Sequence, residues 1–185
     1  MNNEEIKNIA NFIKSEEENK QNKYESITKK GLELFNKKQT AKFIEFYNNE
    51  VHSIAERIEA LEVLLSEVLE TENYDWKKVL KFRESISKSK NNDFIYLFDD
   101  VIFQLGSISP EEFIKTIDDG IKKQIPMAYV IKSFFYYYGL DNFEESIQAI
   151  EKAILLEPTN IEFKKIRKEL ENKRTALEQE NCEEN

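Results

Sequence analysis

Apolar residues recur at helical spacing along most of the chain, and Gly, Pro, Asn and Asp mark the breaks between the periodic segments. The pattern predicts an all-α protein. The scarcity of Gly and Pro, 4 and 3 residues, also favours long helices over turn-rich sheets. The expected helices cover roughly 3–18, 22–37, 39–50, 53–72, 74–89, 93–105, 109–123, 126–139, 142–157 and 160–178.

The helical pattern repeats along the chain. Gly139 follows Gly106 by 33 residues, and at that offset the segment DFIYLFDDVIFQLG falls on PMAYVIKSFFYYYG. One more step back places apolar residues of the segment ALEVLLSEVLE on the same positions, and a degenerate fourth unit falls at 27–49. A period near 33 with two helices per unit predicts an α-solenoid, in which each hairpin buries its apolar face by stacking on the next.

The segment DNFEESIQAIEKAILLEPTN resembles the second half of a tetratricopeptide repeat, with Phe143 at the aromatic position, Ala153 at the small position and Pro158 closing the unit. The resemblance implies a right-handed superhelix of stacked hairpins, whose inner helices line a concave surface that holds a segment of a partner protein. Four regions are expected: N-terminal helices with the degenerate repeat (1–58), three hairpins (59–158), a capping helix (159–180) and a disordered acidic tail (181–185). Ile161, Ile166 and Leu170 form the apolar stripe of the capping helix.

The run SFFYYYG contains five consecutive aromatic residues, which must point all round a helix because each residue advances by about 100°. Phe134, Phe135 and Tyr138 continue an apolar stripe at core spacing, so we expect them in the core. The opposite face is rich in aromatic and acidic residues, which is typical of an interface. The predicted ligand-binding residues are Glu67, Tyr96, Asp99, Asp100, Phe103, Tyr129, Lys132, Tyr136 and Tyr137.

This surface predicts a non-enzymatic adaptor or chaperone-like protein. Its ligand would be a polypeptide segment that carries basic and apolar residues, because acids outnumber bases on the face. Two other readings of the aromatic face are open: packing within the chain, including N-terminal helices that fill the groove, and a homodimer contact. Alternative functions are a dedicated inhibitor, an acidic nucleic-acid mimic and an uncharacterised hydrolase.

The net charge of -9 argues against nucleic-acid binding, because it repels phosphate backbones. The single cysteine and single histidine, Cys182 and His52, provide neither metal-ligand spacing nor a catalytic triad, so no cofactor or metal is expected. The adjacent pair Asp99 and Asp100 points in two directions on a helix and does not converge on one atom. Without a membrane span or leader pattern, we expect a soluble, cytoplasmic protein.

Overall fold

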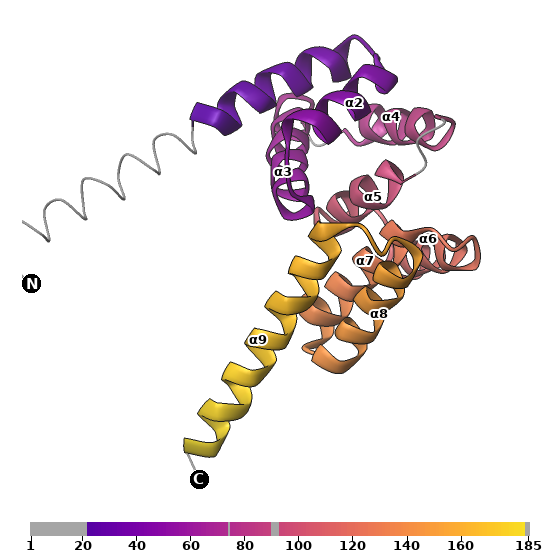
Figure 1. Ribbon diagram of the computed structural model, residues 1–185. Coiled ribbons are helices and arrows are strands. Elements are labelled where there is room, and N and C mark those ends of the chain that lie inside the picture. The colour runs from indigo at the N-terminus through magenta and orange to yellow at the C-terminus, as the bar shows by residue number, and fades with distance from the viewer. Residues whose placement is uncertain (1–21, 74, 90–92, 184–185) are drawn as a thin grey trace, which may run out of the picture.

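The computed structural model describes residues 22–73, 75–89 and 93–183, and these ranges contain helices and turns but no strand (Figure 1). A first helix runs through residues 22–36. It is followed by α2 (Thr40–Glu50), α3 (Ile54–Thr71), α4 (Lys77–Ser87), α5 (Phe94–Gln104), α6 (Pro110–Lys122), α7 (Pro126–Phe134), the π-helix η1 (Phe135–Gly139), α8 (Phe143–Leu156) and α9 (Ile161–Glu183). The predicted all-α class is therefore confirmed.

In the described ranges the helix boundaries lie close to the predicted ones, with two differences. The predicted helix at 126–139 is divided into α7 and η1. Helix α9 continues to Glu183, beyond the predicted helix end at 178. The predicted helix at 3–18 lies outside the described residues.

Short polar residues set the starts of several helices. Ser53 Oγ accepts a hydrogen bond from the backbone N–H of Glu56, and Ser109 Oγ accepts one from Glu112, at 3.1 and 3.2 Å. Asn142 caps α8 in the same way, through the N–H of Glu145. Each cap satisfies one of the N–H groups that a helix start leaves without a partner. The pattern of a capping residue three positions before Glu therefore explains where these three helices begin.

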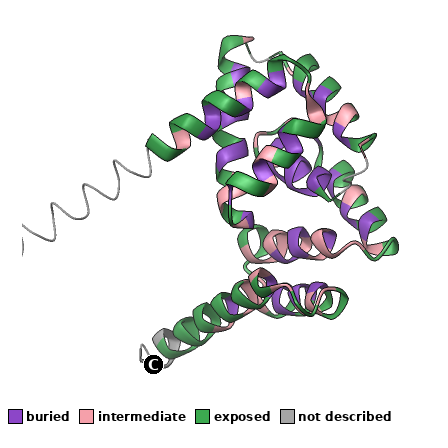
Figure 2. Cartoon of the chain, turned by 45° about the horizontal axis from the view of Figure 1, so that its top comes forward, coloured by how far each residue is buried: buried purple, intermediate pink, exposed green. Residues whose placement is uncertain are grey.

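Helix α5 packs against both α3 and α7, and most helices also pack against their neighbours in the chain. Among these neighbours, α4 and α6 pack on α5, and α8 packs on α7. The interior of this arrangement is apolar, and Figure 2 shows the buried residues concentrated where α5 and its neighbours meet. These contacts bury one face of each helix, which explains why apolar residues recur at helical spacing in the sequence.

Helix α9 packs on α8 through its N-terminal half only. Phe163 and Leu170 are buried and Ile166 is half-buried, whereas Ile161 is exposed. The predicted stripe is therefore wrong at Ile161, and Phe163 takes its place, because the helix begins at Ile161 and turns its first residue outward. All residues from 172 to 179 are exposed, as Figure 2 shows.

Gly120 marks a close approach between helices α6 and α7. A Cβ atom at this position would lie 2.6 Å from Ala128 Cβ and 2.6 Å from the hydroxyl oxygen of Tyr96. Ala128 Cβ can move only with the backbone of α7, so the approach requires glycine here. Gly139 has no such constraint, because its Cβ would lie 3.7 Å from the nearest ring atom of Phe135.

Gly120→Ala should lower the free energy of unfolding by about 1–3 kcal/mol, the usual effect of overpacking a filled interface. The gain in helix propensity, about 1 kcal/mol, is too small to reverse it. Gly139→Ala is the matched control and should stay within about 1 kcal/mol of the wild type. Urea unfolding measures both variants. Equal midpoints for the two variants would contradict the close approach.

Candidate interaction surface

Helix α5 lies in the middle of the fold, with helices on several sides. Every residue from Phe94 to Ile102 is buried, because α3, α4, α6 and α7 all pack against this helix. The exposed fractions of Tyr96, Asp99 and Asp100 are 5%, 0% and 6%. The prediction that these three side chains line an open face is therefore wrong.

Asp99 is held by an arginine from the neighbouring helix α4. Arg83 Nε donates to Asp99 Oδ1 and Arg83 Nη2 donates to Asp99 Oδ2, both at 2.7 Å. Burial raises the pKa of the Asp99 carboxyl, while the hydrogen bonds and charge of Arg83 oppose that shift. Because both carboxylate oxygens are engaged in this bidentate pair, Asp99 links α4 to α5 and is not available to a ligand.

Asp100 faces a different neighbour from Asp99, as expected for adjacent residues on a helix. Its Oδ2 accepts a hydrogen bond of 2.7 Å from Gln104 Nε2. The pKa of Asp100 is raised to about 6, mainly by burial and to a smaller extent by the nearby charge of Glu62, while the hydrogen bond from Gln104 opposes the rise. Asp100 is thus a buried, weakly compensated carboxylate beneath the acidic side of α3.

Phe103 is half-buried and stacks on an aromatic ring of α6. The ring centroids of Phe103 and Phe113 are 4.4 Å apart with an interplanar angle of 2°. Phe135 approaches the same pair, with its centroid 6.4 Å from that of Phe103. Phe103 therefore contributes to packing among α5, α6 and η1, and only part of its surface can reach a partner.

The predicted residues of α7 and η1 have two different environments. Tyr129, Lys132 and Tyr136 are half-buried, and the Lys132 ammonium lies 5.6 Å from the centre of the Tyr136 ring. Tyr137 contacts Lys173 of α9. Lys173 Nζ lies 4.8 Å from the centre of the Tyr137 ring and donates a 2.9 Å hydrogen bond to the Tyr137 hydroxyl oxygen. Packing within the chain therefore accounts for Tyr137.

The π-helix η1 changes which aromatic side chains face the core. Phe134 and Phe135 are half-buried and pack on the core, but Tyr138 is 76% exposed. The prediction of a core position for Tyr138 is wrong. A π turn closes its hydrogen bond one residue later than an α turn, so the stripe counted at 3.6 residues per turn loses phase there.

A groove of about 610 Å³ lies between the first helix and α3. Leu32 and Val63 give it an apolar centre, and Val63 is 44% exposed. Thr28 also lines the groove, and its buried hydroxyl oxygen has no hydrogen-bond partner among residues 22–73, 75–89 and 93–183. At one end, the Tyr24 hydroxyl donates a 2.6 Å hydrogen bond to Glu59 Oε2 and joins the two helices. The groove is thus an apolar surface between two helices, with polar residues at its edges.

The α3 side of this groove is strongly acidic. Glu67 lies in the groove and, with Val63, also borders a shallow hollow along α3. That hollow is lined further by Glu59, Glu62, Ser66 and Glu70. Of the predicted ligand-binding residues, Glu67 is the one that lines the groove, whereas Tyr96, Asp99 and Asp100 are in the interior.

The groove residues of the first helix were not among the predicted site residues. Tyr24, Thr28 and Leu32 follow one another at intervals of four, which places them on one face of a helix. That spacing could have indicated a shared face. The sequence did not indicate that α3, some 35 residues away, forms the other wall.

Comparisons of the chain with protein-family models, with curated proteins and with solved structures found no match. Among the described helices, none is long and apolar enough to cross a membrane. Within the same ranges, no group of three or more His, Cys, Asp or Glu side chains is placed to hold a metal ion.

The raised pKa of Asp100 predicts a specific pH dependence of stability. The pKa rises from an ordinary 3.8 to about 6 on folding, so the folded state holds this proton more tightly than the unfolded state. Its contribution to stability is therefore present below about pH 4 and is lost as the pH rises to about 6. A shift of two units corresponds to about 3 kcal/mol.

Asp100→Asn removes this titration and keeps an oxygen that can accept the hydrogen bond from Gln104. Relative to the wild type, the variant should gain up to about 3 kcal/mol in free energy of unfolding between pH 4 and pH 7. Urea unfolding at several pH values measures the difference. Asp118→Asn, which removes an exposed carboxylate from α6, is the control. If the free energies of unfolding of Asp100→Asn and the wild type differed by the same amount at every pH in this range, the raised pKa would be contradicted.

Proposed function

We propose that the chain is a non-enzymatic protein-interaction module, an adaptor or chaperone-like helical repeat of the tetratricopeptide type, that binds a polypeptide segment. The packing of α3 on α5 and of α5 on α7 supports the repeat, because stacked hairpins bring every second helix into contact. The segment that carries the resemblance, Phe143 to Pro158, forms α8 and the turn after it, and this helical structure supports the proposal.

The observation that carries the binding proposal is the groove between the first helix and α3. It places apolar Leu32 and Val63 beside the acidic side chains of α3. A groove between two helices suits an amphipathic helix, which inserts its apolar side chains and keeps its polar face outside. Lys or Arg residues at the edge of that helix would meet Glu67. The partner is therefore a helical segment with apolar residues flanked by basic ones.

Charge adds a kinetic argument to this assignment. The chain carries a net charge of -9, and α3 presents Glu62, Glu67 and Glu70 along its exposed side. Complementary charge accelerates association and selects among partners more than it raises affinity. A basic segment would be attracted to this side of the protein, and an acidic one would be repelled.

The aromatic residues of α7 and η1 stay in the proposal as a second contact region. Tyr129, Lys132 and Tyr136 are half-buried, so each keeps part of its surface for a partner. Half-exposed tyrosines are common at interfaces because they bury a large area and lose little rotamer freedom. The buried residues Tyr96, Asp99 and Asp100 are left out of the proposed contacts.

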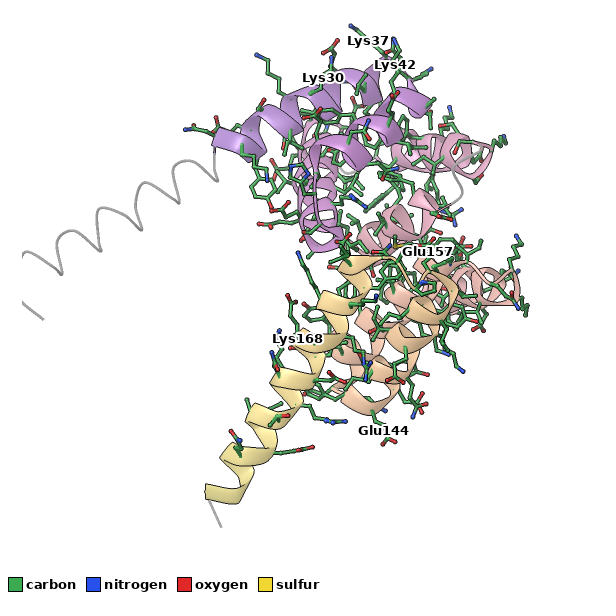
Figure 3. The ribbon with its side chains drawn as sticks, viewed as in Figure 1. Lys30, Lys37, Lys42, Glu144, Glu157 and Lys168 are labelled. Atoms are coloured by element: carbon green, nitrogen blue, oxygen red, sulfur yellow. The ribbon has the colours of Figure 1, made fainter. Side chains whose placement is uncertain are left out.

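The test is selection of helical peptides from a displayed library on the full chain. The recovered peptides should carry Lys or Arg beside Leu, Ile or Phe. Glu67→Lys should weaken binding of a selected peptide at least about tenfold, since a reversed charge at the groove repels the basic residues. Glu144→Lys makes the same charge change at the N-terminal end of α8, where Figure 3 labels the side chain. It should alter the affinity less than about twofold.

Recovery of acidic peptides, or an equal loss of affinity in Glu67→Lys and Glu144→Lys, would exclude the groove as the binding site. Circular dichroism of both variants checks that the fold is retained. Because both residues are exposed, neither variant should lose helical content.

A further inference from the structure

A second hollow, of about 430 Å³, has the opposite charge. It lies between helix α4 and the turn that joins the first helix to α2. Lys38 from the turn and Lys78 and Lys81 from α4 line it. Lys38 is about 40 positions from the other two in the sequence, so the three meet only in the folded chain. A locally basic hollow therefore exists within a protein whose net charge is -9.

The positive charge of this hollow is only partly neutralised. Lys78 pairs with Glu72. In the described part of the chain, Lys38 and Lys81 form no ion pair. Nearby bases are engaged elsewhere, since Arg83 binds Asp99 and Lys37 binds Glu33. Two lysines that form no ion pair within the described ranges and a third, paired one thus line one small space, and each ammonium group carries three N–H donors.

The base of the hollow is apolar and firmly packed. Phe35 and Phe82 line it, with their ring centroids 4.6 Å apart, and Phe82 also packs on Phe43 at 4.9 Å. A 2.7 Å hydrogen bond between Thr40 Oγ1 and Ser85 Oγ ties the start of α2 to α4 at the same place. The hollow is therefore formed before any ligand arrives, which lowers the entropic cost of binding.

We propose that this lysine hollow binds a small molecule that carries a phosphate monoester on an apolar or aromatic body. The phosphate brings close to two negative charges at neutral pH, which matches two to three ammonium groups better than the single charge of a carboxylate does. Lysine binds phosphate as a point charge. The volume of about 430 Å³ lies within the range of small-molecule sites. Phe35 and Phe82, which are 4% and 5% exposed, form the apolar base of the hollow, and the methylene stems of the lysines supply the rest of the surface for the apolar body. This site is separate from the peptide groove and does not depend on it.

Calorimetry with three probes tests the site on the full chain. Phenyl phosphate should bind the wild type more tightly than inorganic phosphate, which lacks the ring, and at least about tenfold more tightly than benzoate, which carries one charge. The variant Lys38→Gln with Lys81→Gln should bind phenyl phosphate at least about tenfold more weakly than the wild type.

The matched control removes the same two charges from nearby exposed positions. Lys30→Gln with Lys42→Gln changes side chains that Figure 3 shows pointing away from the first helix and α2, and neither residue lines the hollow. This control should bind phenyl phosphate as the wild type does. All four lysines are exposed, and thermal unfolding of each variant checks that folding is retained.

Several outcomes would overturn the proposal. One is the absence of phenyl phosphate binding at millimolar concentration. Another is an equal loss of affinity for phenyl phosphate in the two double variants, which would show that binding depends on net charge alone. Benzoate binding as tightly as phenyl phosphate would exclude selection for phosphate. Binding of a short single-stranded oligonucleotide, lost in Lys38→Gln with Lys81→Gln while phenyl phosphate does not bind, would assign the lysines to a nucleic-acid backbone instead.

Discussion

The enclosure of α5 by its neighbours is the constraint on which the rest of the structure depends. Helices α3, α4, α6 and α7 all pack on it, and no residue from Phe94 to Ile102 is exposed. The bidentate pair between Arg83 and Asp99 fixes α4 to this central helix. A buried carboxylate without its arginine would be strongly destabilising, so the pair restricts how α4 can be placed. The groove is formed partly by α3 and the lysine hollow partly by α4, and both of these helices pack on α5.

Charge is distributed unevenly over the N-terminal helices. The acidic residues of α3 border the groove beside the first helix, whereas Lys38, Lys78 and Lys81 meet between the turn before α2 and helix α4. The first helix contributes to both places, through Leu32 at the groove and Phe35 at the hollow. A single acidic chain can thus present two hollows of opposite charge, because local potentials depend on which residues the fold brings together.

The π turn of η1 decides which side chains of the aromatic run face the core. Five consecutive rings on a regular helix would divide into a core stripe and an outer pair at fixed angles. In η1 the wider turn directs Tyr138 to solvent and leaves Phe135 against Phe113 at 6.1 Å. Tyr137 then lies against Phe143 and beneath Lys173 of α9. The division of the run is therefore set by backbone geometry together with the position of the last helix.

Within the described ranges, the sequence by itself determined the all-α class and most of the helix boundaries, because helical periodicity and caps such as Ser53, Ser109 and Asn142 act within one turn. It did not determine which polar faces are open. The sequence pattern predicts Asp99 at the surface, but Arg83 from another helix pairs with it in the interior. The same pattern predicts Tyr138 in the core, but the π turn changes the direction of its side chain. Lys38 and Lys81 form a basic site only when α4 packs beside the turn before α2. Such features arise from contacts between distant segments, which local periodicity does not encode.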